Sequence, residues 1–303
     1  MSESVFFTGV SGFIGSNLML NLKSSLNLRL LDLNLRNLNW ENRIRLDTFA
    51  IIHLAGKAHD LKKTSNPNEY YQVNTELTKE VFNAFLTSEA KVFITLSSVK
   101  AVADEVHGEL IEEHIPNPIT HYGKSKRLAE EYILSKDIPE GKRVYVLRPC
   151  MIHGTGNKGN LNLLYKIGSK NIPWPLGAFD KKRSFCSIDN LMFVIKELIE
   201  REDIPSGIYN VADDEPLSTN ELINLIAESQ NRKPKILKIS KGLIESLAKI
   251  GDNFHLPLNS ERLQKLTSSY VVSNSKIKAA IGKPLPVSSR EGLLKTFNSF
   301  NHS

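Results

Sequence analysis

Cysteine is scarce in this chain, and long hydrophobic runs are missing. Only two cysteines, Cys150 and Cys186, occur among the 303 residues, too few for a disulfide framework or a four-cysteine zinc site. No window approaches the roughly 18 uninterrupted apolar residues of a membrane-spanning helix. The first residues also lack the basic segment and apolar stretch of a secretory signal. We therefore expect a cytoplasmic protein without membrane insertion.

Charge of one sign does not dominate either. The 39 Lys and Arg residues exceed the 33 Asp and Glu residues by a formal charge of +6, and 41% of the residues are hydrophobic. These values are typical of a folded globular chain, and no uninterrupted basic run indicates a nucleic-acid partner. The small positive excess is compatible with an anionic small-molecule substrate.

In the first half of the chain, short apolar runs alternate with segments of helical period. This rhythm predicts βαβ units and an α/β fold with a parallel sheet. A helix is expected after Asn74, where apolar residues recur at a spacing of three to four. The segment 34–48 is short and polar, so any element there is stunted. The five strands expected are 4–8, 28–33, 50–54, 91–96 and 143–148.

Three glycines follow the first predicted strand at the spacing of a phosphate-binding turn. Gly9, Gly12 and Gly15 precede a helical segment, so they allow a tight turn, a diphosphate at the helix N-terminus and close helix packing. The alternative is an ordinary strand-to-helix turn, but an acid at the end of the second strand, Asp32, favours dinucleotide binding. The fold class expected is therefore a Rossmann-type doubly wound parallel sheet.

Asp32 also bears on which dinucleotide binds. A carboxylate here accepts hydrogen bonds from the adenosine ribose and repels a 2′-phosphate, so NAD is favoured over NADP. Arg36, four residues on, either accommodates that phosphate or is a solvated loop charge. After about Cys150 the pattern loosens into loops, then helices near 218–230, 241–250 and 289–300. We predict a dinucleotide-binding domain over 1–150 and mainly a smaller substrate-binding subdomain over 151–303, with some segments returning to the sheet.

A tyrosine and a lysine stand four residues apart where another helix is expected. On one helix, Tyr122 and Lys126 would share a face, about 6 Å apart along the axis. An ammonium at that distance is expected to lower the pKa of the phenol and make it usable as an acid or base. On an exposed helix such a pair has no function, but Ser97 and Ser98 close the preceding strand, at the sheet edge where ligands bind.

The sequence resembles the extended short-chain dehydrogenase/reductase family, in particular nucleotide-sugar 4-epimerases and 4-keto-sugar reductases. The resemblance covers nearly the whole chain, and its motifs occur in family order. They are TGVSGFIG at 8–15, IIHLAG at 51–56, VN at 73–74, SS at 97–98, YGKSK at 122–126, LRP at 147–149, RSFCSIDNL at 183–191, YNVADDEPLST at 209–219 and SKIKAAIGKPLPVSSREGL at 275–293.

The resemblance implies a role for each matching residue. The catalytic residues implied are Ser98, Tyr122 and Lys126, with Lys126 also holding the nicotinamide ribose. Ser98, Asn160, Leu161 and Arg183 are implied for the substrate, the last three near its diphosphate, and Arg262 is a weaker candidate. The cofactor residues implied are Gly9, Gly12, Phe13, Ile14, Gly15, Asp32, Leu54, Ala55, Gly56, Tyr122 and Lys126.

Three departures from the family pattern bear on the reaction. Val99 and Lys100 stand where the 4,6-dehydratases carry an Asp-Glu pair, which disfavours dehydration. Met151 replaces an Asn that touches the substrate phosphates in many epimerases. The acid on the adenine side is uncertain, with Asp47 as a candidate. The scattered histidines, His59 among them, lack a metal-binding spacing, so no metal is expected.

The leading hypothesis is an NAD-dependent epimerase that inverts C4 of a UDP-hexose or UDP-N-acetylhexosamine through a transient 4-keto sugar, as in polysaccharide precursor synthesis. Two alternatives stay open. One is an NAD(P)H-dependent reductase of a nucleotide-linked 4-keto sugar, and the other is a non-catalytic dinucleotide-sensing protein. The resemblance also implies a homodimer paired through two helices that include the Tyr122 helix.

Overall fold

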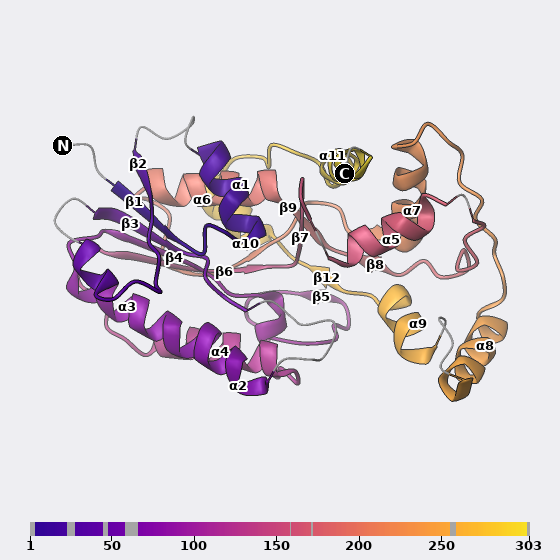
Figure 1. The fold of residues 1–303 in the computed structure, drawn as a ribbon, viewed down its shortest axis with the longest axis horizontal. Helices are drawn as coiled ribbons and strands as arrows, with labels where there is room; N and C mark the ends of the chain where they lie inside the picture. Colours follow the sequence, from indigo (N-terminus) through magenta and orange to yellow (C-terminus); the bar gives the residue numbers. More distant parts are fainter. Residues whose placement is uncertain are drawn as a thin grey trace.

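A six-stranded parallel sheet forms the centre of the protein in a computed structural model that describes residues 4–22, 28–44, 48–57, 66–157, 159–170, 172–254 and 259–301. The strands run in the order β10-β6-β4-β3-β1-β2, and every neighbouring pair is parallel (Figure 1). Their bounds are β1 (Ser4–Thr8), β2 (Arg29–Asp32), β3 (Thr48–His53), β4 (Val92–Leu96), β6 (Arg143–Pro149) and β10 (Gly207–Val211).

The five predicted strands are confirmed, with ends that differ by at most two residues. Strand β10 was not predicted, because its sequence GIYNV contains a glycine and an asparagine that are unusual in a buried strand. Residues of β1 alternate between the two sides of the sheet: Val5 and Phe7 belong to one core cluster, and Phe6 belongs to another. The sheet is therefore covered on both faces, which explains its nearly continuous apolar strands.

Helices from distant parts of the sequence cover the two faces (Figure 1). On the first face lie α1 (Phe13–Leu22), α6 (Ile188–Glu200) and α10 (Ser275–Ile281). On the second face α3 (Leu77–Thr87) buries Val81, Phe82 and Phe85, and α4 (His121–Leu134) buries Ile133. The predicted helix after Asn74 is thus confirmed as α3. A short helix, α2 (Pro67–Tyr71), lies against α4.

The chain changes direction across the sheet at β1, which lies between β2 and β3. Ligands of open α/β sheets bind outside the carboxyl ends of the strands at such a switch point. Between β2 and β3, the described residues form only the short helix η1 (Trp40–Arg43). Strand β2 lies at the edge of the sheet in the described part of the chain, and the expected stunted segment is confirmed for residues 34–44.

A second core lies beside the sheet and is built mostly from helices. Leu161, Tyr165, Ile226, Ile244 and Phe297 are among its buried members. Its helices are α5 (Asn160–Gly168), α7 (Thr219–Glu228), α8 (Lys241–Phe254), α9 (Ser260–Thr267) and α11 (Ser289–Phe300), which confirm the three helices predicted in this half. Short strand pairs join it to the sheet: β7 (Met151–His153) with β9 (Phe185–Ser187), β8 (Lys182–Arg183) with β11 (Leu217–Ser218), and β5 (Glu109–Leu110) with β12 (Val271–Val272).

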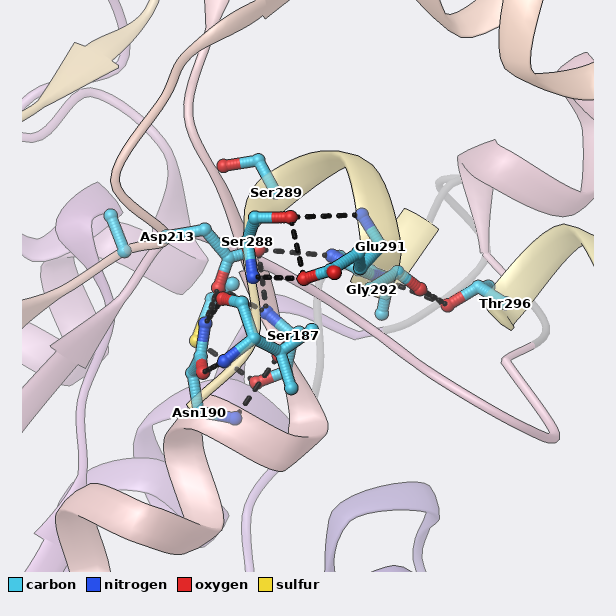
Figure 2. Close-up of polar contacts among 12 residues, drawn as sticks. Ser187, Asn190, Asp213, Ser288, Ser289, Glu291, Gly292 and Thr296 are labelled. Carbon is cyan, nitrogen blue, oxygen red and sulfur yellow. Dashed lines mark hydrogen bonds and ion pairs between the residues drawn. The ribbon is translucent and has the colours of Figure 1, made fainter. Parts of the chain in front are cut away.

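A buried polar cluster ties the two cores together (Figure 2). Asp213, just after β10, accepts hydrogen bonds from the Ser187 amide at 2.9 and 3.0 Å and from the Asn190 side chain at 2.6 Å. His153 lies between Asp213, at 3.3 Å, and Thr296 of α11, at 2.9 Å. The last helix of the chain is therefore anchored to the end of the sheet. None of the helices in the described ranges combines the length and the apolar character needed to cross a bilayer.

Candidate active site

The glycine turn after β1 fits a dinucleotide. Gly9 has φ +70°, and a Cβ there would lie 2.7 Å from the Ala55 nitrogen. A Cβ on Gly15 would overlap the Gly9 carbonyl oxygen. Helix α1 begins at Phe13, so the amides of its first turn have no helical partner and can donate to a diphosphate. Only residues without side chains allow this helix to start so close to the strand.

A buried hydrogen-bond chain holds the loop 54–56 against the end of β1. Thr8 Oγ1 accepts from the backbone nitrogens of residues 54 and 55, at 3.1 and 3.0 Å, and lies 2.9 Å from His53 Nδ1. His53 Nε2 lies 3.0 Å from Thr78 Oγ1. Burial, and secondarily the charge of Lys126, lowers the pKa of His53 to about 3. His53 is therefore uncharged, and its hydrogen bonds with Thr8 and Thr78 fix this side of the site.

Asp32 lies at the carboxyl end of β2, beside the end of β1. It is paired in register with Phe7, and the next amide, that of Leu33, donates to the Phe7 carbonyl at 2.8 Å. Both Asp32 and Arg36 are exposed. The candidate ribose acid thus stands on the same sheet edge as the glycine turn, whereas Asp47 and His59 lie outside the described residues.

Ser98 and Tyr122 meet at the end of β4. Ser98 is buried and caps η3 (Val99–Ala101) by accepting from the Lys100 amide at 3.2 Å. Helix α4 begins one residue before Tyr122, with Thr120 as its N-cap, so the predicted helix does include Tyr122. Burial of the hydroxyl end raises the pKa of Tyr122, and a hydrogen bond with Ser98 opposes this rise.

Lys126 lies one turn further along α4 and is buried. Its Nζ donates to the Leu96 carbonyl at 2.8 Å, two residues before Ser98. Burial lowers the pKa of Lys126 to about 8, although the nearby Glu130 carboxylate acts in the opposite direction. The expected lowering of the Tyr122 pKa is wrong for this structure, because burial of the phenol raises the pKa and the hydrogen bond with Ser98 opposes this rise only in part.

The lowered pKa of Lys126 predicts a pH-dependent contribution to stability. Between about pH 8 and the unfolded-chain value near 10.4, the unfolded chain holds the lysine proton and the folded chain does not, so the free energy of unfolding rises by about 1.4 kcal/mol per pH unit. Denaturant titrations of the wild type and Lys126→Met at pH 8 to 10 should show this difference in slope.

The comparison with Lys126→Met is needed because other groups titrate in the same range. Burial raises the pKa values of Cys150 and Cys186, which lowers the free energy of unfolding as the pH rises. The wild type and Lys126→Met share this contribution of the two cysteines, so it cancels in the difference between their slopes. Equal slopes for the two proteins would contradict the lowered pKa of Lys126.

Asn74 connects the cofactor loop to the catalytic helix, a role that the sequence did not reveal. Its Oδ1 accepts from the Lys57 amide at 2.8 Å, and its Nδ2 donates to Ser125 Oγ at 3.0 Å. It lies in a π-helical turn, Gln72–Glu76, of the kind often found at functional sites. A Cβ on Gly56 would lie 3.1 Å from both Asn74 Oδ1 and Lys126 Nζ. The motif VN at 73–74 was the available signal.

A buried ion pair lies behind Lys126. Arg148 donates to both carboxylate oxygens of Glu130, at 2.9 and 2.6 Å, and Ser97 Oγ donates to the same carboxylate at 2.5 Å. Glu130 and Arg148 are each 1% exposed. Next to them is a cavity of about 10 Å³, lined by the polar side chains of Asn74, Thr78, Thr95, Ser97, Lys126 and Glu130, with room for one water molecule. This buried cluster fixes the bottom of the site, behind Lys126.

One carboxylate joins the segment after Ser98 to the start of α4. Asp104 Oδ2 accepts from the amides of Ile119, at 2.7 Å, and Thr120, at 3.1 Å, and Oδ1 accepts from the Thr120 hydroxyl at 3.2 Å. A Cβ on Gly123 would overlap the Lys100 carbonyl oxygen. The two segments that carry the catalytic hydroxyls are therefore packed backbone to backbone.

The residues implied for the diphosphate come from the second core. Arg183 is half-buried, and its Nε donates to the Ser268 carbonyl at 2.9 Å; it forms no ion pair with any other residue that the structure describes. Burial lowers its pKa without removing its charge. Leu161 is 2% exposed and packs in the core, so only its backbone at the start of α5 is left for a ligand. Asn160 begins α5, and its side chain is not among those that the structure describes.

A metal site is not evident in the described part of the chain, where no three histidine, cysteine or acidic residues gather in a ligand set. The site instead offers a glycine turn, a serine-tyrosine pair, a buried lysine and a half-buried arginine. This donor set suits an organic cofactor and an anionic substrate.

Comparisons with known proteins agree with this geometry. The model of the NAD dependent epimerase/dehydratase family matches residues 5–212. A UDP-glucose 4-epimerase of Vibrio cholerae is 27% identical over 99% of this chain and 96% of its own length. An N-acetyl-alpha-D-glucosaminyl-diphospho-ditrans,octacis-undecaprenol 4-epimerase of Escherichia coli O157:H7 is 27% identical over 77% of this chain and 74% of its own. The fold matches a UDP-N-acetylglucosamine 4-epimerase from Bacillus cereus with TM-score 0.76, 18% identity and full coverage of both chains.

Proposed function

Because the chain belongs to the NAD dependent epimerase/dehydratase family, we propose that it inverts C4 of a sugar linked to a nucleoside diphosphate, with a UDP-hexose or UDP-N-acetylhexosamine as substrate. The observation that carries this proposal is the pairing of Ser98 with Tyr122 above the buried Lys126. Two hydroxyls that share one hydrogen bond can both reach a single sugar oxygen, as oxidation and reduction at one carbon require.

Tyr122 is the proton carrier in this mechanism. It takes the proton of the C4 hydroxyl as the carbon is oxidised and returns a proton to the same oxygen after the 4-keto sugar has turned over. Ser98 donates a hydrogen bond to that oxygen in both steps. NAD bound in the turn 9–15 would supply reversible hydride transfer at C4, without net consumption of the cofactor. Lys126 supplies a positive charge that favours the phenolate once its hydrogen bond to Leu96 is shared.

The cofactor would be held by the turn 9–15, the loop 54–56 and Asp32. The turn 9–15 would receive the diphosphate at the start of α1, where Phe13 and Ile14 are the first helical residues. Leu54, Ala55 and Gly56 would pass beside it, and Lys126 would bond the nicotinamide ribose. On the substrate side, Arg183 and the backbone of Asn160 and Leu161 would bind the diphosphate.

A substitution at Asp32 tests this arrangement, because Asp32 is expected to set the preference for NAD over NADP. We expect Asp32→Asn to raise the dissociation constant of NAD by about tenfold or more, since a hydrogen bond to a charged group contributes about 1.5–3 kcal/mol, and to improve binding of NADP. Isothermal titration of both dinucleotides measures this change. Glu41→Gln, an exposed acid in η1, is the matched control. An unchanged NAD to NADP ratio would remove Asp32 from the cofactor site.

A reductase of nucleotide-linked 4-keto sugars is the second candidate, because the same Ser98 and Tyr122 hydroxyls can bind a carbonyl oxygen. A phenol that keeps its proton is prepared to protonate a carbonyl oxygen as hydride arrives. The two reactions differ in stoichiometry, because an epimerase interconverts two sugars without net cofactor change and a reductase consumes NADH or NADPH.

The deciding experiment is incubation of the protein with single UDP-sugars, with products resolved by NMR and NADH followed by absorbance. Interconversion of two C4 epimers without net NADH change supports the epimerase. Net NADH consumption with a 4-keto sugar selects the reductase. N-acetylglucosaminyl-diphospho-undecaprenol belongs in the panel, because a relative acts on that substrate. No turnover of any panel member, with NAD still bound, would favour a dinucleotide-sensing protein.

The expected substrate is a small molecule. A homodimer paired through two helices that include the Tyr122 helix, α4, stays a prediction, and α3 is the helix that packs beside α4. These two helices lie side by side on one face of the sheet (Figure 1). Leu128 and Leu134 of α4 are 43% and 55% exposed, which is compatible with such a pairing.

A further inference from the structure

Helix α8 carries an apolar surface that is wider than the face it buries. Ile244, Ala248 and Gly251 are buried, and the first two pack in the second core. A second apolar stripe lies beside that face and is exposed. It consists of Leu243, Leu247, Ile250 and Phe254, which are 54%, 45%, 49% and 72% exposed. Their spacing of four, three and four residues places them on one side of the helix.

The segment that leads into α8 is strongly basic. Residues 232–241, with the sequence RKPKILKISK, contain five basic residues and no acidic residue. Lys233, Lys235 and Lys238 are exposed, and none of them forms an ion pair within the described ranges. Their backbone is fixed: the Trp174 amide donates to the Lys235 carbonyl at 2.7 Å, and the Leu237 amide donates to the Trp174 carbonyl at 2.8 Å. Leu237 adds a further 47% exposed apolar side chain.

Helix α8 lies at the end of the molecule that is far from the sheet and the N-terminus, with α9 as its neighbour (Figure 1). Acidic side chains on α8 do not oppose the basic segment strongly. The helix has two acidic residues, Glu245 and Asp252. Asp252 accepts hydrogen bonds from the Ser260 amide and hydroxyl at 2.9 and 2.6 Å. An exposed apolar stripe next to unpaired lysines is typical of a helix that lies on a membrane surface.

We propose that α8 and segment 232–241 attach this protein to an anionic lipid surface. The stripe would enter the boundary between headgroups and acyl chains, and the lysines would meet the lipid phosphates. The 14-residue helix would lie in the interface and would not cross the bilayer.

A second copy of this chain fits the same surface less well. A stable interface buries about 800 Å² on each partner, roughly 20 residues a side, and the stripe offers four side chains. In a two-fold contact, the basic segment would also face its own copy and be repelled by it. Anionic lipids neutralise that charge.

The test is flotation of the purified protein with vesicles of phosphatidylglycerol and phosphatidylcholine in equal parts, and with phosphatidylcholine alone. We expect flotation with the mixed vesicles at low salt and weaker flotation as salt rises. The double variant Leu247→Glu, Ile250→Glu should lose at least about tenfold in vesicle affinity. Reversal of Lys235 and Lys238 to Glu should lose more than about fivefold for each residue, since each change removes an attraction and adds a repulsion.

The matched control is Leu20→Glu on α1, a leucine that is 78% exposed and lies on another helix. This variant should float like the wild type. Each variant is first checked for NAD binding, so that unfolding is distinguished from loss of the lipid contact. Flotation needs no turnover, so its outcome is independent of the proposed function.

Three results would overturn the inference. They are absence of wild-type flotation with the mixed vesicles, undiminished flotation of the double variant, and a fall in molecular mass of the double variant by light scattering. The last result would show that the stripe joins two copies of the chain.

Discussion

Replacement of Tyr122 by phenylalanine is expected to lower kcat by about a hundredfold to ten-thousandfold, the usual contribution of a positioned acid or base. The change removes the hydroxyl that bonds Ser98 and keeps the ring, which packs edge-on against Tyr70 with centroids 6.2 Å apart. Binding of NAD should stay nearly unchanged, because the phenol is one of several expected contacts. Steady-state kinetics on the active UDP-sugar and titration with NAD measure both quantities.

The control for this variant is Tyr132→Phe. Tyr132 lies on the same helix, ten residues along, and its hydroxyl donates to Asn83 at 2.8 Å. Tyr132→Phe loses a surface hydrogen bond remote from Ser98, so its kcat should stay near that of the wild type. Equal activity in Tyr122→Phe and the wild type would remove Tyr122 from the chemistry.

Glu130→Gln is expected to lower the free energy of unfolding by about 3–5 kcal/mol, because it leaves Arg148 charged, buried and without its carboxylate. The cost is large because both side chains are almost fully enclosed. Denaturant unfolding in the absence of cofactor measures the loss.

Glu131→Gln is the matched control, since Glu131 is the next residue, pairs with Arg127 at 2.8 Å and has a side chain that is 50% exposed. An exposed pair of this kind contributes about 0.3–0.5 kcal/mol. The double variant Glu130→Leu, Arg148→Met should recover much of the stability lost by Glu130→Gln, because it removes both charges together. Losses of the same size at 130 and 131 would show that the buried pair has no special importance.

Much of the sheet could be predicted, because strands covered on both faces are nearly continuous apolar runs. Strands β1, β3, β4 and β6 have that character, and glycines mark the turn after β1. Strand β10 could not be found in this way, because its buried Asn210 has its partners far along the chain: the side-chain Nδ2 donates to the Leu110 carbonyl at 3.3 Å, and the backbone amide donates to Glu112 at 2.7 Å. Contacts over such distances leave no periodic signal.

For the site, spacing predicted which residues meet but not how their charges behave. Tyr122 and Lys126 share a helix as expected, yet the pKa of Tyr122 is raised because its hydroxyl is buried, and the spacing of two residues on one helix does not reveal that burial. Leu161 was expected near the substrate diphosphate, and the sequence did not reveal that its side chain lies in the core, where the period of α5 turns it inward. Arg148 at the end of an apolar strand was a readable sign of a buried partner.

The clamp formed by Asp104 has a dynamic consequence. It fastens the loop behind one catalytic hydroxyl to the helix that bears the other, and both sit on the sheet side of the molecule. Arg183 donates instead to the carbonyl of Ser268, the residue that follows α9. Tyr270, two residues after Ser268, donates to the Ala103 carbonyl at 2.7 Å, so we expect the arginine and the proton-transfer pair to move as one body.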